Sequence, residues 1–392
     1  MSVTPVLPDI DFALADAPNL HELLDETRKF GTVVPVQYHG EISYLINSHA
    51  ELREAFADEE HFASRAGYEV IAEPSMGRTL QVMEADEHRV NRLLMSKPFL
   101  PSRVRGYVEG LITEEATRRL DALDGKSEIE MVEGFARPFP FSVITRLLGL
   151  PVHDEAQFLG WALKIIDFPW DPEGALRARR EFEDYLRPLV KLRRENPAED
   201  VLSLLATSEL EGKRLEDEEI FAFCMLLFPA GSDTAYKNLG SLLYAILSTP
   251  GMRERAKESD QARDDMVLEG LRWMPPTSLL PRRCSADTEL GGVALKAGTP
   301  MLFGITAANA DPDVFPDPRR FDPDRANKNE HLAFGHGEHF CPGSHLARRE
   351  LETALKLIFE RFPDLELIPE RPVEFFGCVL RGPRDLWVRP NL

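Results

Sequence analysis

The chain of 392 residues is poor in cysteine, in long hydrophobic runs and in positive charge. Its four cysteines form no C-x-x-C pair, which argues against a disulfide scaffold or a zinc site and favours a reducing compartment. The longest nearly apolar run, from Ile220 to Gly231, is shorter than the roughly 20 residues that a membrane span needs. Residues 1–18 lack the basic and apolar regions of a secretory signal. These absences predict a cytoplasmic protein without a membrane partner.

The charge balance limits the choice of partner, and the absence of linkers limits the domain organisation. A net charge of −20 argues against nucleic acid, because phosphates attract clusters of Lys and Arg. No Ser/Gly-rich linker, repeat or low-complexity tract divides the chain, so we expect a single domain over residues 1–392. Its β-rich part is expected at about 30–75, 276–310 and 370–392, and its helical part at about 80–275 and 342–360.

Hydrophobic periodicity and turn residues predict most of the individual elements. Strands at 32–38 and 42–46 are expected to form a hairpin, and a helix at 49–57 follows. Residues 66–82 show no clear periodicity and are predicted to be a loop. Further elements are expected as helices at 86–96, 101–123, 132–149, 154–166, 173–194, 217–248, 259–273 and 344–359, and as a last β segment at 373–388.

The most informative stretch is a glycine-rich loop, residues 334–343, which contains Cys341. A helix begins directly after the loop, and the positive end of a helix lowers the pKa of a nearby thiol and favours its anion. Gly335, Gly337 and Gly343 allow backbone to approach something flat and bulky, and allow unusual dihedral angles. Such a thiolate suits the proximal position of a haem iron. The alternative is a buried structural cysteine after a turn.

A second informative stretch interrupts the longest predicted helix, where Ala230, Gly231, Asp233 and Thr234 follow an apolar segment. The two small residues leave room beside the helix for a diatomic ligand. Pro229 lacks an N–H group and crowds the preceding turn, which predicts a kink. The alternative is a local break in which the Thr234 hydroxyl bonds to a backbone carbonyl.

Together these two stretches resemble the cytochromes P450, in particular soluble bacterial members. The loop is similar to the haem-binding signature aromatic-Gly-x-Gly-x-His/Arg-x-Cys-x-Gly, and the helix is similar to the Ala/Gly-Gly-x-Asp/Glu-Thr oxygen-activation motif. The resemblance covers nearly the whole chain. It implies a mainly α fold with a smaller β-rich portion (α+β), and haem b between the long central helix and the helix after the cysteine.

The resemblance also implies roles for single residues. Cys341 would be the axial ligand of the haem iron, Thr234 would hydrogen-bond the bound oxygen species, and Asp233 would relay protons to it. Pro229 departs from the family pattern and leaves the geometry of the oxygen groove open. Further contacts to the cofactor are expected from Phe334, Gly343 and Gly231.

A Glu-x-x-Arg sequence at Glu269 and Arg272 places a carboxylate and a guanidinium on one helical face. It resembles the motif that in P450s locks the underside of the haem pocket, with Arg325 as its third member. The plain alternative is a surface ion pair worth a few tenths of a kcal/mol.

Cations are needed for the two propionates of haem. His88 and Arg92 are four residues apart and so lie on one helical face. By resemblance they bind propionate together with Arg282 and with His339, which is two residues before the cysteine. Arg283 is the reserve choice for Arg282.

Substrate contacts follow only from the resemblance, as mainly apolar segments with few fixed charges. The expected substrate is therefore a small apolar or aromatic molecule. The individual pocket residues expected are Ala230, Leu279, Leu280 and Val379.

The expected function is that of a P450 monooxygenase, which inserts one atom of O₂ into its substrate. The protein is expected to be a monomer. Electrons would come from NAD(P)H through a separate reductase and a ferredoxin-type donor, because the chain has no flavin or iron–sulfur motif. The alternatives are a haem-thiolate peroxygenase or an oxidative coupling or desaturation enzyme, and a non-catalytic haem-binding sensor or recruitment module. A basic stretch between residues 89 and 119, with Arg348 and Arg349, is either a docking patch for the donor or an ordinary solvated surface.

Overall fold

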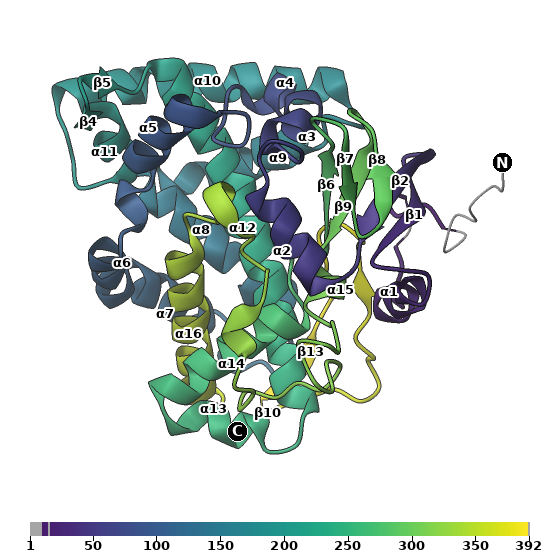
Figure 1. Ribbon diagram of the computed structural model, residues 1–392. Coiled ribbons are helices and arrows are strands. Elements are labelled where there is room, and N and C mark those ends of the chain that lie inside the picture. Colours follow the sequence, from purple (N-terminus) through teal and green to yellow (C-terminus); the bar gives the residue numbers. More distant parts are fainter. Residues whose placement is uncertain (1–9, 15, 391–392) are drawn as a thin grey trace.

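A computed structural model describes residues 10–14 and 16–390. Most of residues 1–18, for which no secretory signal is expected, lies outside this part, as do the last two residues of the expected β-rich range 370–392. Figure 1 shows the main sheet at one side of the molecule and helices over most of the rest. The expected mainly α fold with a smaller β-rich portion is confirmed. No helix of the described residues is long and apolar enough to cross a membrane.

The helices agree with the expected ranges from α5 onward, although α11, α13 and α15 were not expected, and α15 lies in the expected β-rich range 276–310. In the expected helix at 101–123, a π-helical turn at Val108–Ile112 lies between two α-helical segments. Another π-helical turn, Val132–Ala136, precedes α8. The α-helices are α1 (Leu20–Arg28), α2 (His49–Ala57), α3 (Ser64–Ile71), α4 (Glu73–Met76), α5 (Ala85–Met95), α6 (Pro101–Tyr107), α7 (Thr113–Asp121), α8 (Pro138–Leu147), α9 (Glu155–Ile166), α10 (Pro172–Glu195), α11 (Val201–Thr207), α12 (Asp217–Ser248), α13 (Met252–Glu258), α14 (Asp260–Trp273), α15 (Ile305–Ala308) and α16 (Ser344–Arg361).

The strands form one larger sheet and several small ones. The larger sheet has the order β1-β2-β9-β6, with β2 and β9 parallel and the other pairs antiparallel. A second sheet has the order β10-β13-β3, and three hairpins are formed by β4 with β5, β7 with β8, and β11 with β12. The strands are β1 (Val33–Tyr38), β2 (Glu41–Ile46), β3 (Ile129–Glu130), β4 (Glu209–Leu210), β5 (Lys213–Arg214), β6 (Leu279–Arg283), β7 (Thr288–Leu290), β8 (Val293–Leu295), β9 (Pro300–Gly304), β10 (Leu365–Leu367), β11 (Phe375–Phe376), β12 (Gly382–Pro383) and β13 (Trp387–Pro390).

Two expectations about the first hundred residues are wrong. Residues 66–82 are not simply a loop, because α3 and α4 occupy much of the stretch. For the same reason the range 30–75 is β-rich only in its first part, where β1 and β2 pair as expected, and helical after that. The short helices carry several polar residues and a proline, so their apolar period is too brief to be recognised.

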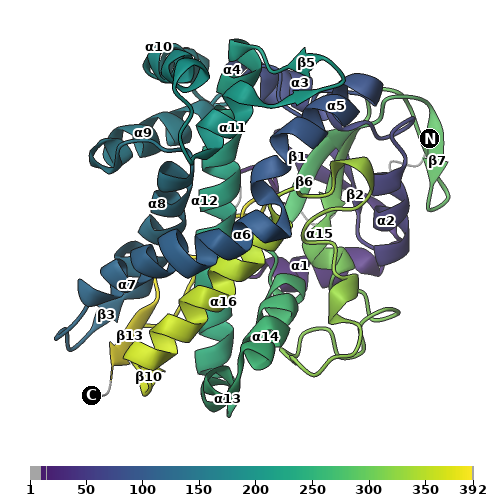
Figure 2. The same cartoon turned by 90° about the vertical axis from the view of Figure 1, so that its left-hand side faces the viewer.

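Helix α12 is the central element on which the others pack. It begins with a capping box, in which Glu216 and Glu219 each bond the backbone N–H of the other. It contacts α8, α9, α10, α14 and α16. Figure 2 shows α16 crossing α12, with α14 beside α16. The helix continues through Pro229, so the expected interruption at that residue does not divide it.

Candidate functional site

The loop before α16 holds Cys341 between backbone groups. The Cys341 N–H donates to the Phe334 carbonyl at 2.9 Å, which closes the loop on itself. The backbone N–H groups of Gly343 and Ser344 point at the Cys341 sulfur, and Ser344 is the first residue of α16. Arg92 of α5 donates to the Phe340 carbonyl of the same loop. The sequence therefore correctly predicted a cysteine just before a helix N-terminus.

The expected lowering of the cysteine pKa is wrong for the polypeptide alone. Burial is the largest influence and raises the pKa of the Cys341 thiol. The N–H groups of Gly343 and Ser344 and the charge of Arg92 lower the pKa but do not outweigh burial. The prediction counted the helix end and the N–H donors, but not the depth at which the loop places the sulfur.

Glycine is suited to two positions of the loop for different structural reasons. Gly337 has φ of +75°, and a Cβ there would be 2.5 Å from the Phe56 carbonyl of α2, so this glycine permits close packing of the loop on α2. At Gly343 a Cβ would meet only the Cys341 sulfur, at 3.9 Å, so the space beside it is open. Of these two glycines, only Gly343 has open space beside it, as was expected for backbone that a flat, bulky ligand approaches.

Four side chains that can carry positive charge meet beside the cysteine loop, as predicted. The rings of His88 and His339 lie 4.2 Å apart, and both residues are close enough to Arg92 and Arg282 to interact electrostatically with at least one of them. Burial, His88, Arg282 and Arg92 together lower the pKa of His339 to about 3. Burial and Arg92 also lower the pKa of His88. The reserve choice, Arg283, instead faces outward and bonds the Gly298 carbonyl.

This cation cluster (His88, Arg92, Arg282 and His339) has too little negative charge around it in the protein. The Nε2 atom of His88 is buried without a hydrogen-bond partner among the described residues. Arg282 is only 8% exposed, and its guanidinium donates to the neighbouring Pro281 carbonyl at 3.3 Å. Two acids lie near the cluster: Glu59, with 3.6 Å between its carboxylate and the His339 ring, and Glu338, whose charge raises the pKa of His88. Buried charges are normally paired, so the cluster fits a dianionic ligand such as the two propionates of haem.

The middle of α12 is accessible, although the helix is buried before and after it. Ala230 is exposed and Gly231, Asp233 and Thr234 are partly exposed, in a helix whose residues 220–225 and 235–243 are buried. The Thr234 hydroxyl donates to the Ala230 carbonyl at 2.7 Å. This is the back-bonding considered from the sequence, yet it occurs without a break in the helix. The acid and the alcohol therefore face open space from a rigid element.

Asp233 has a partner that sequence reasoning missed. The Nζ atom of Lys237, one turn later in α12, donates to both carboxylate oxygens of Asp233 at 2.8 and 2.7 Å. The side chain of Lys237 is 7% exposed and that of Asp233 is 16% exposed. The i, i+4 spacing of acid and base in the sequence was the available signal for this pair.

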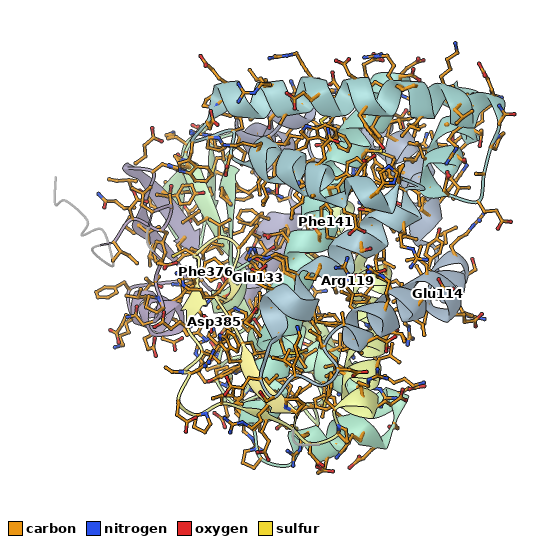
Figure 3. The ribbon with its side chains drawn as sticks, turned by 180° about the vertical axis from the view of Figure 1, so that it is seen from behind. Glu114, Arg119, Glu133, Phe141, Phe376 and Asp385 are labelled. Carbon is orange, nitrogen blue, oxygen red and sulfur yellow. The ribbon has the colours of Figure 1, made fainter. Side chains whose placement is uncertain are left out.

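Gly231 is small because of α8 rather than because of a ligand. A Cβ at Gly231 would be 2.8 Å from Cδ1 and 3.0 Å from Cγ1 of Ile144. On the same contact, Phe141 of α8 (labelled in Figure 3) packs against Phe228 with ring centroids 5.4 Å apart. The side of Gly231 on which a Cβ would lie is filled by Ile144 of α8. The expected role of Gly231 in leaving room for a diatomic ligand is therefore not supported.

The Glu-x-x-Arg pair is buried and joined by its expected third member. Glu269 and Arg272 form two hydrogen bonds of 2.6 and 2.8 Å, and both side chains are fully enclosed. Arg325 reaches the same carboxylate at 3.5 Å. Arg272 also donates to the carbonyls of Asn309 and Pro318. The alternative of a surface ion pair is excluded, because neither partner touches solvent.

The expected substrate residues divide between open and enclosed positions. Ala230 is exposed, and Leu280 and Val379 are partly exposed. Leu279 is wrong as a pocket residue, because it is completely buried and packs in a separate core cluster with Leu45. Adjacent strand residues point to opposite faces, so Leu279 and Leu280 could not both face one pocket.

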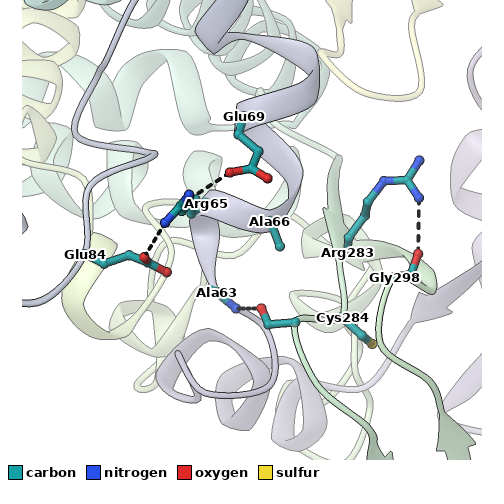
Figure 4. A pocket seen from close by; sticks show the side chains of 9 residues that line it. Ala63, Arg65, Ala66, Glu69, Glu84, Arg283, Cys284 and Gly298 are labelled. Atoms are coloured by element: carbon teal, nitrogen blue, oxygen red, sulfur yellow. Dashed lines mark hydrogen bonds and ion pairs between the residues drawn. The ribbon is translucent and has the colours of Figure 1, made fainter.

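A surface pocket of about 290 Å³ lies beside the end of β6 (Figure 4). Arg65 spans one side of it with ion pairs to Glu69 and Glu84, and Arg283 and Cys284 form the opposite side. Apart from Arg283, the reserve choice for a propionate ligand, none of the expected catalytic or cofactor-binding residues lines this pocket. It is therefore separate from the cysteine loop and from the open part of α12.

Comparison with known proteins agrees with this geometry. Residues 152–378 match the family model of cytochrome P450. The putative cytochrome P450 YjiB of Bacillus subtilis is 33% identical over 348 residues, or 86% of each chain. The 6-deoxyerythronolide B hydroxylase of Saccharopolyspora erythraea is 30% identical over 360 residues, covering 87% of this chain and 88% of that protein. The solved structure of cytochrome P450 PksS from Bacillus subtilis superposes with a TM-score of 0.88 at 28% identity, covering 96% of this chain and 97% of that one. The chain therefore belongs to the cytochrome P450 family and is a haem-binding monooxygenase.

Proposed function

We propose that Cys341 is the axial ligand of the haem iron. The supporting observation, on which the proposal chiefly depends, is the sulfur beside the N–H groups of Gly343 and Ser344 at the start of α16. These donors stabilise a thiolate electrostatically, and iron coordination removes the thiol proton. Bound haem supplies the activation of O₂, with the thiolate favouring O–O cleavage.

The cation cluster holds the propionates in this proposal. Arg282 and Arg92 supply permanent charge, while His88 and His339 supply N–H donors. A dianion beside His88 and His339 favours their protonated forms, which reverses the depressing effect of the neighbouring arginines. Phe334, whose ring centroid lies 6.2 Å from that of Phe340, belongs to the cysteine loop and would contact the bound haem.

Asp233 and Thr234 move protons on the open side of α12. The Thr234 hydroxyl donates to the Ala230 carbonyl, so its oxygen lone pairs remain available to accept a hydrogen bond. The Asp233 carboxylate is partly exposed and belongs to a long helix. A group that exchanges protons with the site needs both this access and a fixed position. Ala230, Gly231 and Ala235 beside them on the helix are small and apolar, which limits the polar groups around the reacting atoms.

The substrate is a small, mostly apolar or aromatic molecule. Ala230, Leu280 and Val379 offer apolar surface that is at least partly open. Relatives support this class: one is a 6-deoxyerythronolide B hydroxylase, and a cytochrome P450 of Bacillus megaterium, 27% identical, is solved in complex with testosterone. The proposal names this class of molecule and no particular compound.

The electron donor is a ferredoxin-type protein reduced by an NAD(P)H-dependent reductase. Several members of the basic stretch are already paired within the protein, because Arg89 bonds Glu211, Arg118 bonds Glu115, and Arg348 bonds Asp264. The docking surface therefore depends mainly on arginines and lysines outside these pairs, such as Lys97 and Arg103. Charge reversal at those two positions is expected to slow reduction more at low salt than at high salt.

The test of the proposal is the difference spectrum of the reduced, CO-bound protein. The red-shifted band typical of thiolate-ligated haem is expected in the wild type and is expected to be absent from Cys341→His. Cys378→Ser, which changes a buried cysteine outside the loop, is the control and should keep the band. A wild-type spectrum without the shifted band, from folded and haem-loaded protein, would contradict the assignment of Cys341.

Thr234→Ala separates the monooxygenase from its alternatives. If O₂ activation depends on this hydroxyl, the variant keeps haem and the CO band but diverts electrons from NAD(P)H to hydrogen peroxide. A peroxygenase would instead turn over with peroxide as well as with NAD(P)H and redox partners. A non-catalytic haem protein would show no difference between variant and wild type in either assay.

A further inference from the structure

Lys237 is the one cation in ion-pair distance of Asp233 among the described residues, and it is nearly buried. Its Nζ atom has both oxygens of Asp233 as acceptors, at 2.8 and 2.7 Å. A buried ammonium group that lost this partner would be left uncompensated. The position of the Lys237 side chain therefore determines the orientation of the Asp233 carboxylate.

That place is made by the β11–β12 hairpin. Gly382 of β12 lies against the lysine stem, because a Cβ on Gly382 would be 2.7 Å from Cγ and 2.8 Å from Cβ of Lys237. Phe376, directly opposite Gly382 in the hairpin, has its ring centroid 5.7 Å from the lysine Nζ. Figure 3 labels Phe376. Tyr236 flanks the ammonium group at 4.6 Å. Cation–π contacts of this kind favour a desolvated ammonium over one that swings away.

We propose that Lys237 is the positioning residue of Asp233 and that Gly382 is required for it. The lysine fixes the direction of the carboxylate on α12 and joins it to a hairpin that is distant in sequence. The proposal rests on the proposed role of Asp233 in proton delivery. It extends that role to two residues that do not touch the reacting atoms, one of them without a side chain.

The first test measures the physical pair and needs no turnover. Thermal unfolding of haem-loaded wild type, Asp233→Asn, Lys237→Met and the double variant forms a double-mutant cycle. Each single change is expected to lower the Tm, and the double variant is expected to unfold at a higher temperature than the sum of the two decreases gives. Additive decreases in Tm would overturn the proposal, because they would show that the two side chains do not interact.

The second test measures proton delivery during turnover. A surrogate ferredoxin and reductase supply the electrons, and testosterone is added as the probe substrate. Lys237→Met is expected to lower the rate of NAD(P)H oxidation on the order of tenfold, since a misplacement of about 1 Å can cost up to roughly 100-fold. The solvent isotope effect in D₂O should increase, while the CO band stays. An unchanged rate and isotope effect would overturn the proposal. Both quantities are measurable whether or not testosterone is hydroxylated.

Gly382→Ala and a matched glycine variant sharpen the second test. Gly240→Ala also adds a Cβ where α12 meets β12, but that atom would meet Pro383 at 2.7 Å and not Lys237. Gly382→Ala should reproduce the slower oxidation and larger isotope effect of Lys237→Met, whereas Gly240→Ala should not. Equal effects of the two glycine variants would mean a general disturbance of the helix–hairpin contact and would contradict the specific role of Gly382.

Arg137→Met controls for the loss of a cation near Tyr236. Arg137 lies 4.9 Å from the same ring and is paired with Glu133 rather than with Asp233. It should leave the oxidation rate and the isotope effect unchanged. Failure of the assignment of Cys341 would look different, because the wild type would then lack the shifted CO band while the unfolding cycle still reported the Lys237–Asp233 pair.

Discussion

Buried charges in this protein are satisfied in two different ways. On α14 and the loop after it, Glu269 and Arg272 are fully enclosed and form two short hydrogen bonds, and Arg325 and backbone carbonyls complete the set. In the cation cluster, by contrast, the histidine rings and arginines face one another, and the Nε2 atom of His88 is buried without a partner among the described residues. One group is complete within the protein, while the other has only the acids Glu59 and Glu338 beside its four cationic side chains.

This difference separates residues that hold the fold from residues that hold a ligand. A closed network of charges contributes by fixing segments that would otherwise be irregular, such as the loop that contains Pro318 and Arg325. An incomplete cluster stores unfavourable electrostatic energy that a bound dianion relieves. Asp233 and Lys237 are intermediate, because they pair with each other while the carboxylate keeps some exposure towards the open part of α12.

The largest expected effect comes from opening the closed network. Arg272→Met should leave the Glu269 carboxylate buried without its main partner, and breaking a buried pair in this way costs about 3–5 kcal/mol. We expect a large fall in thermal stability and a loss of haem content, measured by calorimetry and by the Soret absorbance of purified protein.

Lys29→Met is the matched control for Arg272→Met. Lys29 pairs with Glu26 at the same i, i+3 spacing, but both side chains are more than half exposed. Its loss should change the free energy of unfolding by less than about 1 kcal/mol. Similar losses of stability in the two variants would show that burial of the Glu269–Arg272 pair does not increase its contribution to stability.

A smaller effect is expected from the pH dependence of the cation cluster. Burial and Arg92 lower the pKa of His88 below its ordinary value of 6.5, so the unfolded chain binds the proton more readily than the folded protein does. The stability that this histidine contributes is therefore complete above pH 6.5 and is lost as the pH falls below it. Haem should reduce this loss, because propionate favours the protonated ring.

The measurement is thermal unfolding between neutral and mildly acidic pH, for haem-free and haem-loaded protein. His88→Gln should flatten the acid decrease of the haem-free protein, and the difference from wild type should shrink when haem is bound. His153→Gln changes an exposed histidine and should alter neither curve. An acid decrease that haem does not change would speak against His88 as a propionate partner.

The sequence predicted the elements and motifs that depend on local pattern, and it failed where tertiary packing decides. The long helix, the cysteine before α16 and the Glu269–Arg272–Arg325 set follow from periodicity and spacing or from resemblance to the family. Lys237 was missed because nothing in the local sequence shows that a lysine inside a helix is buried. Its i, i+4 spacing from Asp233 is common on solvated helices, and only the approach of Gly382 from a distant hairpin encloses it.

Leu279 was misassigned for a related physical reason. Leu279 and Leu280 were both assigned to the pocket, but adjacent side chains in β6 alternate between faces. Leu279 therefore enters one core cluster, while Leu280 is partly buried against another. The strand's register against β9 decides which residue turns inward, with Leu279 opposite Gly304 and Leu280 opposite Phe303. That register depends on a pairing with residues more than twenty positions away, which the local pattern does not contain.

The smallest expected effect concerns Gly231, a residue assigned to the ligand side from the sequence but packed against α8 in the structure. In Gly231→Ala the new Cβ would be 2.8 Å from Cδ1 of Ile144, and overpacking of this kind costs about 1–3 kcal/mol. Alanine in a helix regains about 1 kcal/mol relative to glycine, so the net loss of stability should be small. The CO band of the variant should remain at the wild-type position.

Ile144→Val distinguishes packing from ligand contact at Gly231. The valine lacks the Cδ1 atom that meets the new Cβ, so the double variant should be more stable than the sum of the single changes predicts. If the space at Gly231 served a ligand instead, relief at Ile144 would not restore the property that Gly231→Ala had lost, and the change would appear in the CO spectrum rather than in the unfolding temperature. Rescue of stability together with an unchanged spectrum would assign Gly231 to the contact between α12 and α8, and would leave Ala230, Asp233 and Thr234 as the residues of that turn that face the open part of the helix.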